Sequence, residues 1–594
     1  MDAYRGKIVN SSDRHTYHDS SRTLVIYRSC QAWGAKYWPD LLVTICFIIV
    51  AVLYYQYRTG HDKVITNLVG DAPMIASVFA GRDYRVDFEG DPLLGQAKTT
   101  DPYIAAAYWY VSFLRRWFQL PYGNAYLTML LPITFLQLLG FYILGRVLCQ
   151  SRILSVLLAV FCTVFIQFES WGEYWGLDRE PLNRVAIGAL MGFFWTMAVY
   201  YGRKPKMRLA IMAAVGSSLW IHPVATPVLG FFLWLSLWTT RAEDETQKKF
   251  IINMCMAAGM FLLILIPYAL QYWSRFGHQD SPPELQKKLF EIMRVGYING
   301  YFRNEWDVIK KFFYEFGWQK PFLSAAAIML IASFSLSNSK DRRTVLQLGL
   351  MAMGILIISD IVFLLDHSLA ARADRIPTQA DLVRGNRFLI PLSFVVLFYS
   401  STVLSHRFGL KVGAPISIII VAFLFFNLQP NLKKFSDDLR QGYRVMMSKE
   451  SPANEADVEM LSWLHEKTPR KTSVTVFFTN LLDNTIRYVA LRPLKFSYKD
   501  SCFFNYFDGE RALEYVKKRA AYTLAIEQKD KKVLFHHAAK TAMLFGSDLV
   551  VIDKGLIDTS YQKLNHAIAW ENVKYVVIDL RRISSSFKSA IAKI

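Results

Sequence analysis

The chain has 594 residues, of which 53% are hydrophobic and 15% aromatic, and it carries a net charge of +20. This composition excludes an ordinary soluble enzyme, and the length exceeds that of one domain, so we expect a membrane protein with several spans. The positive charge does not indicate a nucleic-acid partner, because no basic stripe interleaved with stacking aromatic residues occurs in the sequence.

Apolar segments recur along the first two thirds of the chain and predict an α-helical polytopic membrane protein with about eleven transmembrane helices. In chain order these segments are Leu41–Tyr57, Ala125–Leu144, Ile153–Phe168, Val185–Tyr201, Leu209–Ile221, Val224–Trp238, Ile251–Leu270, Pro321–Leu336, Val345–Leu365, Phe388–Leu404 and Pro415–Leu428. Several are shorter than the ~20 residues of a full crossing, so one or two could be tilted, extended or re-entrant.

Positive charge marks alternate short gaps between these segments. Each of the gaps 202–208, 240–249, 337–343 and 405–411 holds several Lys or Arg residues. By the positive-inside rule these gaps and an N-terminal segment 1–40 are cytoplasmic. We therefore expect a chain in the plasma (inner) membrane, with a transmembrane region 41–428 whose outer loops are 58–124, 169–184, 274–320 and 367–387.

The pattern changes near residue 429 to that of a soluble, extracytoplasmic α/β domain covering 429–594. Strands and helices alternate there, which favours a partly parallel sheet. The predicted strands are Ser473–Phe478, Asp548–Ile552 and Tyr575–Asp579, and the predicted helices are Glu455–Lys467, Glu510–Ala525 and one within Lys531–Phe545. No glycine-rich nucleotide-binding motif occurs in this region.

Motifs in the outer loops resemble those of GT-C membrane glycosyltransferases. An acid, Asp71, follows the first span and precedes the amphipathic "PYIAAAYWYVSFLRRWF" and the span "AYLTMLLPITFLQLLGFYILGRVL", which ends near an Arg. Paired spans broken at His222-Pro223 and the entry "RGNRFLIP" to a late span are also similar to that family. The pair "WLHEKTPRKTSVTVFF" and "RPLKFSYKDSCFF" resembles the outer domain of a group of bacterial membrane proteins with this layout.

The resemblance implies transfer of a sugar from a polyprenyl phosphate or pyrophosphate in the bilayer to a glycan, lipid or protein acceptor. The expected partners are therefore membrane lipid, the lipid-linked donor and that acceptor. In the family, an acid of the first outer loop takes the proton of the attacking hydroxyl, cations neutralise the departing phosphate, and the anomeric configuration inverts.

Asp71 is the candidate catalytic base that the resemblance implies. An acid before a helix pattern can instead serve as an N-cap, and the two roles are compatible. The other acids of this loop are interpreted as solvated: Asp83, Asp87, Glu89 and Asp91.

Asp178 and Glu180, in the second outer loop, are candidate metal ligands. Their spacing lets both carboxylates face one hard cation such as Mg²⁺ or Mn²⁺, the only cofactor that the sequence suggests. In a simpler interpretation they pair with Arg179 and Arg184 and cap a helix that begins at Pro181. Arg179 could equally hold a lipid phosphate.

Further candidate donor-binding residues lie on the same predicted side of the membrane. His222 precedes a proline at the outer end of a span, although packed histidines are more common than catalytic ones. Arg384 and Arg387 precede a span and could hold phosphate or anchor the chain at the interface, and Arg387 matches the family's Arg-aromatic-x-x-Pro position. Tyr297 and Tyr301 could stack on sugar rings or belong to an interfacial aromatic belt.

Two other functional classes fit parts of the sequence. A transporter or flippase for lipid-linked glycans would need charges inside the spans, and the spans carry almost none; Asp360 is the clear exception. A non-catalytic envelope assembly protein would use the outer domain to bind a partner. Replacement of Asp71 separates the enzyme from both.

Overall fold

The structure is a computed structural model of the whole chain. It describes residues 37–60, 62, 64–66, 68–96, 106–164, 177, 180–181, 183–223, 225–272, 284–285, 287–288, 291, 320–373, 382–447, 455–477, 483–500 and 509–585.

Within these residues, a helix occupies each of the eleven apolar segments predicted from the sequence. The first runs over Tyr37–Thr59. The others are α6 (Leu130–Cys149), α7 (Arg152–Val164), α8 (Asn183–Thr196), α9 (Pro205–Ser217), α10 (Ala225–Leu237), α11 (Gln247–Tyr272), α14 (Lys320–Leu336), α15 (Ser339–Leu356), α17 (Leu389–Phe408) and α18 (Leu410–Met447). Two continue through π-helical turns, α8 into η3 (Met197–Tyr201) and α15 into η8 (Ile357–Val362) and α16 (Phe363–Arg372).

Among the described residues, six helices are long and apolar enough to cross a membrane. They are Tyr37–Thr59, Tyr122–Cys149, Gln247–Leu270, Asp341–Arg372, Leu382–Phe408 and Leu410–Met447. Four further apolar helices are shorter, at Arg152–Val164, Val185–Tyr201, Ala225–Leu237 and Pro321–Leu336. The prediction of a helical membrane protein is thus confirmed at the coarse level, while eleven crossings stay a prediction.

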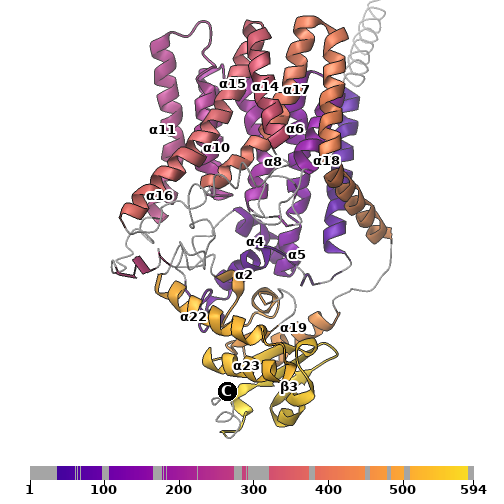
Figure 1. Cartoon of the computed structure of the whole chain (residues 1–594), viewed down its shortest axis with the longest axis vertical. Coiled ribbons are helices and arrows are strands. Elements are labelled where there is room, and N and C mark those ends of the chain that lie inside the picture. Colours follow the sequence, from indigo (N-terminus) through magenta and orange to yellow (C-terminus); the bar gives the residue numbers. More distant parts are fainter. Residues whose placement is uncertain are drawn as a thin grey trace, which may run out of the picture.

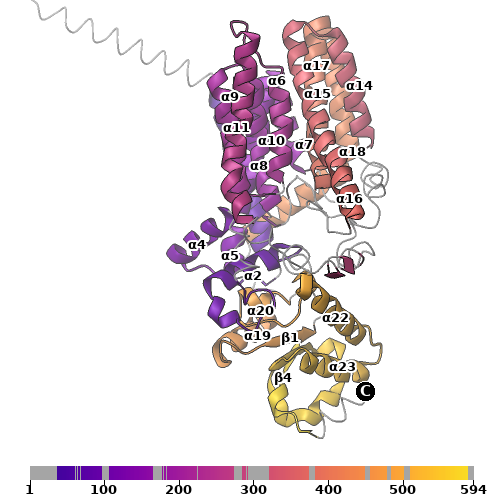
Figure 2. The ribbon, with the colours of Figure 1, turned by 90° about the vertical axis from the view of Figure 1, so that its left-hand side faces the viewer.

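The helices form a long bundle that Figure 2 shows as two groups, one containing α8 to α11 and the other α14 to α18. Helix α6 packs against α7 and α8, α10 packs against α15, and α17 packs against α14 and α18. One large apolar core runs through both groups, with Trp195 and Phe232 among its fully buried side chains.

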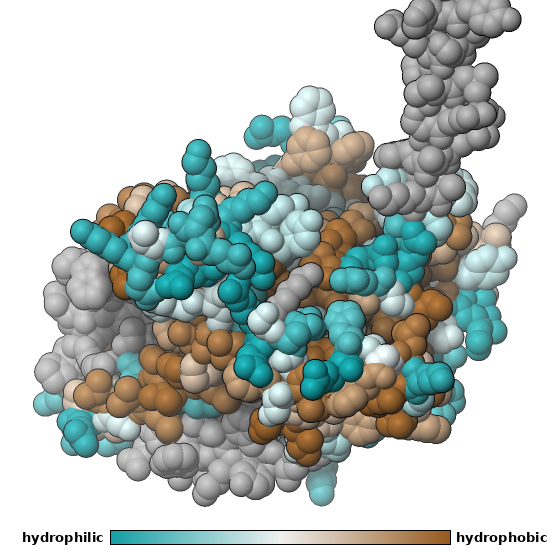
Figure 3. Space-filling view, turned by 90° about the horizontal axis from the view of Figure 1, so that it is seen from above, coloured by the Kyte–Doolittle hydropathy of each residue, from teal (hydrophilic) through white to brown (hydrophobic). Residues whose placement is uncertain are grey.

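The four basic gaps lie at the end of the bundle away from the α/β domain (Figure 1), an end that we call the basic face. Seen from above, Figure 3 shows hydrophilic side chains gathered over this end. Most cations of these gaps are exposed, but Arg208 is completely buried and pairs with Glu245. The basic gaps and the α/β domain thus lie at opposite ends, as the predicted topology requires, and the orientation in the membrane stays a prediction.

Between the bundle and the α/β domain lies a middle layer built from the first long loop (Figure 1). Its helices are α2 (Ala72–Asp83), the short 3₁₀ helix η1 (Arg85–Phe88), α4 (Ala106–Phe118) and α5 (Tyr122–Leu127). Helix α4 is amphipathic, as the resemblance implies, and exposes Trp109, Phe113 and Trp117 at four-residue spacing on one face.

The α/β domain contains a four-stranded sheet in the order β1-β2-β4-β3. Strand β1 (Val474–Phe477) pairs in parallel with β2 (Leu549–Asp553), whereas β4 (Tyr575–Asp579) runs antiparallel to both β2 and β3 (Ile568–Glu571). The described helices are α19 (Glu455–Lys467), α20 (Thr485–Tyr488), α22 (Gly509–Ile526) and α23 (Lys531–Leu544). The partly parallel sheet and its three predicted strands are confirmed, and β3 is an addition.

The boundary between the two regions differs from the prediction. Helix α18 continues past residue 428 as far as Met447, with Pro415 and Pro430 inside it, and the described α/β fold begins at Glu455. The apolar pattern ends before the helix does because the last five turns of α18 carry polar side chains, including Lys433, Lys434 and Asp437, although Phe435 and Gly442 still pack against the first helix.

Candidate functional site

Helix α2 places Asp71 between the bundle and the α/β domain. All but the last two residues of α2 are buried, because its apolar side chains cover both faces. Met74 and Val78 pack into the core of the α/β domain, whereas Ile75 and Phe79 pack into a second core formed with the bundle. The helix that follows Asp71 therefore joins the two regions.

Asp71 stands at the N-cap position of α2, but its side chain makes no capping hydrogen bond. The carboxylate instead accepts from Lys499, with 3.1 Å between Lys499 Nζ and Asp71 Oδ1, and both side chains are partly exposed. Because Lys499 belongs to the α/β domain, the ion pair joins the two regions of the chain. The pair requires the carboxylate form of Asp71, which is the form that a general base needs.

Glu180 lies close to the same segment of the first loop. Its Oε1 accepts from Arg58 Nη2 at 2.5 Å and from the backbone N–H of Val69 at 3.1 Å, and the residue is 1% exposed. Val69 is two residues before Asp71, so the structure brings Glu180 into the neighbourhood of Asp71. Burial, with the charge of Glu180 as a second cause, raises the pKa of the nearby Tyr488 well above its usual value.

Only one of the two predicted metal ligands, Glu180, can be compared with the structure, because Asp178 lies outside the described residues. One oxygen of Glu180 is already engaged by a guanidinium and an amide. Within the described part of the chain no group of three or more His, Cys, Asp or Glu residues gathers as metal ligands. The Mg²⁺ or Mn²⁺ site therefore stays a prediction.

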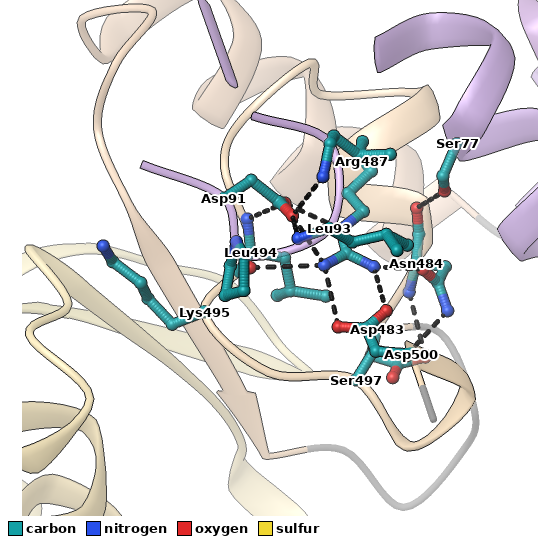
Figure 4. A network of polar contacts seen from close by, with 12 residues as sticks. Ser77, Asp91, Leu93, Asp483, Asn484, Arg487, Leu494, Lys495, Ser497 and Asp500 are labelled. Atoms are coloured by element: carbon teal, nitrogen blue, oxygen red, sulfur yellow. Dashed lines mark hydrogen bonds and ion pairs between the residues drawn. The ribbon is translucent and has the colours of Figure 1, made fainter. Parts of the chain in front are cut away.

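Arg487 on α20 fastens the α/β domain to the first loop (Figure 4). Its guanidinium donates to both oxygens of Asp91 at 2.8 and 2.9 Å and to both oxygens of Asp500 at 2.6 and 3.0 Å. All three side chains are essentially inaccessible to solvent. Asp91 also accepts from the backbone N–H groups of Leu93, Leu94 and Leu494.

Asp91 was expected to be a solvated loop acid, and that interpretation is wrong. A buried carboxylate needs charged or N–H partners, and the ones at Asp91 come from its own loop and from residues almost 400 positions away. The remaining acids of the set are closer to the expectation: Asp83, Asp87 and Glu89 retain solvent exposure and make ion pairs with Arg115, Arg470 and Lys471.

The net charge of the Arg487 cluster is unbalanced, with one cation between two acids. Burial lowers the pKa of Arg487, but the charges of Asp500 and Asp91 outweigh it and the pKa is raised overall. Burial raises the pKa of Asp500 to about 6, against the attraction of Arg487 and with the help of repulsion from Asp91.

A pH dependence of the junction follows from Asp500. The pKa of Asp500 is higher in the folded state than in the unfolded state, so between about pH 4 and pH 6 the folded protein binds more protons than the unfolded one. The stability that proton binding contributes is therefore lost as pH rises from about 4 through about 6. On lowering pH from 7.5 to 5, the wild type should gain about 1 kcal/mol relative to Asp500→Asn, as measured by thermal unfolding of both proteins across that range. Parallel pH profiles would contradict the assignment.

A second group of predicted residues lies at the end of the bundle that faces the α/β domain. His222 precedes α10, and its Nδ1 accepts from the backbone N–H of Ala225 at 3.1 Å, so the side chain caps the helix. Arg384 and Arg387 lie on the 3₁₀ segment η9 (Leu382–Phe388), which packs against α10, η8 and α17. Arg387 is only 7% exposed, so other parts of the protein cover most of its side chain.

Three other predicted residues, Arg179, Tyr297 and Tyr301, lie outside the described residues, as Asp178 does. The described candidates thus fall into two groups. Asp71 and Glu180 lie in the middle layer, and His222, Arg384 and Arg387 lie at the end of the bundle. Whether the two groups share one cleft stays a prediction.

Sequence reasoning missed Lys499 and Arg58, the partners of the two acids in the middle layer. Arg58 follows the first span and has the pattern of an interfacial anchor, and Lys499 belongs to a domain 428 positions away from Asp71. The only signal in the sequence was that Lys499 is a cation and Asp71 an acid, and such charges are too common to indicate a specific pair.

Comparison with known proteins adds no relative. No protein-family model matches the chain, and no curated protein matches it either. The likeness to GT-C glycosyltransferases therefore rests on the sequence motifs alone.

Proposed function

We propose that the protein is an integral membrane glycosyltransferase of the GT-C type. It moves a sugar from a polyprenyl phosphate or pyrophosphate to a glycan, lipid or protein acceptor on the side of the membrane that carries the α/β domain. The observation that carries the proposal is Asp71, a carboxylate paired with a lysine of the α/β domain, at the start of a buried helix that packs against both the bundle and that domain.

In this proposal Asp71 acts as the general base. The acceptor oxygen forms a bond to the anomeric carbon and loses its proton to the Asp71 carboxylate, while the bond from that carbon to the phosphate oxygen breaks. The phosphate keeps the electron pair and leaves as the lipid phosphate, so the anomeric configuration inverts. Lys499 competes with the acceptor for Asp71 and must yield as the acceptor binds.

The departing phosphate needs cations, and Arg387, Arg384 and His222 are the proposed donors at the bundle end, with Arg179 as a further one. Burial of Arg387 supports this role, because a guanidinium in a water-poor site attracts phosphate more strongly than one in water. Tyr297 and Tyr301 are proposed to stack on the sugar, and Asp178 with Glu180 to hold a divalent cation where one is required.

The test uses the purified full chain in lipid nanodiscs with a panel of synthetic polyprenyl-phosphate sugars and sugar acceptors. Wild-type protein should release the polyprenyl phosphate, measured by mass spectrometry, and Asp71→Asn should lower that rate by ~10²–10⁴-fold. The matched control is Glu89→Gln, an exposed acid of the same loop, which should keep wild-type activity. Equal rates for the wild type and Asp71→Asn would refute the role of Asp71 as base.

Transport of lipid-linked glycans is the second candidate function, because one observation favours it. Asp360 places a carboxylate in an apolar span, and such residues commonly line substrate or ion paths. Movement of a labelled lipid-linked sugar across proteoliposomes, lost in Asp360→Asn and kept in Asp71→Asn, would favour transport over transfer.

A further inference from the structure

Asp360 stands in a distorted turn of a membrane-crossing helix. The helix Asp341–Arg372 is regular up to Leu356, widens into the π-helical turn η8, and becomes regular again from Phe363. π-helical turns are rare in proteins, and those that occur are often found at functional sites. The neighbouring segment is η9, which packs against η8 and brings Asn386 to Asp360.

The Asp360 carboxylate has a single neutral partner. Asn386 Nδ2 donates to Asp360 Oδ1 at 2.5 Å, and within the described part of the chain no cation forms an ion pair with Asp360. An unpaired carboxylate inside a membrane-crossing bundle is costly, so it must be neutralised by a proton or by a cation.

Two more oxygens beside Asp360 have no partner among the described residues. Asn386 Oδ1 and Ser359 Oγ are buried without a hydrogen bond there, and both residues are 0% exposed. Ser359 Oγ lies against Gly385, the residue before Asn386, where an added Cβ would come within 2.3 Å of it. A carboxylate and two neutral oxygens thus gather where η8 meets η9.

The other π-helical turn provides a comparison inside the same bundle. In η3, the carbonyl oxygen of Ala198 accepts from Gln347 Nε2 at 3.1 Å, so a side chain of another helix satisfies the distorted backbone. At η8 the described residues leave buried oxygens unsatisfied instead. Widening of the helix alone therefore does not account for the polar groups at η8.

We propose that Asp360, Asn386 and Ser359 bind an alkali cation of the size of Na⁺. All three offer oxygen atoms, which hard cations prefer. A monovalent ion would cancel the single negative charge of the site, whereas a divalent ion would leave a net positive charge in apolar surroundings. Sodium sites at broken membrane helices also use oxygen ligands, which there come from unwound backbone carbonyls and the C-terminal ends of half-helices. The site is independent of the glycosyltransferase proposal.

The test is the thermal unfolding of the full chain in nanodiscs, titrated with NaCl against choline chloride at constant ionic strength and pH. Because the ion binds only the folded state, the unfolding midpoint should rise with the logarithm of Na⁺ concentration above the dissociation constant. Asp360→Asn should abolish the rise, and Ser359→Ala should shift the half-saturating concentration upward by several-fold. Asp366→Asn, six residues further along the same helix, should respond as the wild type does.

Equal midpoints in NaCl and choline chloride would overturn the proposal, as would a Na⁺ response retained in Asp360→Asn. A midpoint that depends on pH through Asp360 and not on Na⁺ would show that a proton neutralises the site, and would also overturn it. Asp360→Asn removes a buried charge and keeps the side-chain shape, so it should fold, and size-exclusion chromatography of each variant verifies that.

Discussion

Replacing Arg487 with methionine is expected to loosen the α/β domain from the first loop. Methionine fills much of the volume but leaves Asp91 and Asp500 buried without their shared cation, a change that costs ~3–5 kcal/mol for buried pairs. Helix α2 packs against α20, the helix that carries Arg487, so the loss should reach α2 as well. Hydrogen exchange of the α2 amides in the full chain should become on the order of 10²-fold faster or more.

Arg470→Met is the matched control for this experiment. Arg470 also links the α/β domain to the first loop, through Asp87, but its side chain is 73% exposed and the N–O distance is 3.4 Å. Exposed ion pairs contribute about 0–1 kcal/mol, so exchange in α2 should change little. Similar exchange rates in Arg487→Met and Arg470→Met would mean that the buried cluster does not fasten the domain.

Asp71 and this cluster both join the first loop to the α/β domain, which connects stability to the proposed chemistry. Ser77, one and a half turns into α2, donates to the carbonyl oxygen of Asn484 at 3.3 Å, and Asn484 in turn accepts from Arg487. A loosened junction should therefore displace Lys499 and Asp71 together. Under the glycosyltransferase proposal, Arg487→Met should lower transfer even though Arg487 touches no substrate.

Much of the bundle could be predicted because a membrane imposes a strong local pattern. An apolar run near bilayer length has few alternatives to a helix, and the described part of each of the eleven predicted runs contains a helix. The strands β1, β2 and β4 could also be predicted from the sequence, since each is a short segment rich in β-branched residues, and all three are buried throughout. Strand β3 was missed because its apolar run, Ile568–Trp570, has only three residues, and none of the four strand residues is fully buried.

The contacts of the candidate site could not be predicted in the same way. Asp71, Asp91 and Glu180 have partners at Lys499, Arg487 and Arg58, and each pair joins residues more than 100 positions apart. Charges in outer loops are common, and nothing local distinguishes Asp91, which is buried, from Asp87 or Glu89, which pair at the surface. Asp91 differs from Asp87 and Glu89 in burial only because the α/β domain packs over it in the folded protein.

A second buried ion pair should stabilise the basic face of the bundle. Arg208 donates from both terminal nitrogens to Glu245 at 2.9 and 2.8 Å, and it also donates to the carbonyl oxygens of Gly202 and Thr240. These contacts join the connection between α8 and α9 to that between α10 and α11. Arg208→Met should lower stability by ~3–5 kcal/mol, because Glu245 would remain buried without a cation.

Thermal unfolding in nanodiscs can separate loss of the charge from loss of the pair. Arg203→Met, an exposed cation of the same connection, should leave the midpoint nearly unchanged. The double variant Arg208→Met/Glu245→Leu removes both charges, so it should recover much of the loss seen in Arg208→Met. If the double variant is as unstable as Arg208→Met, the carbonyl contacts of Gly202 and Thr240, rather than the unpaired Glu245, account for the loss.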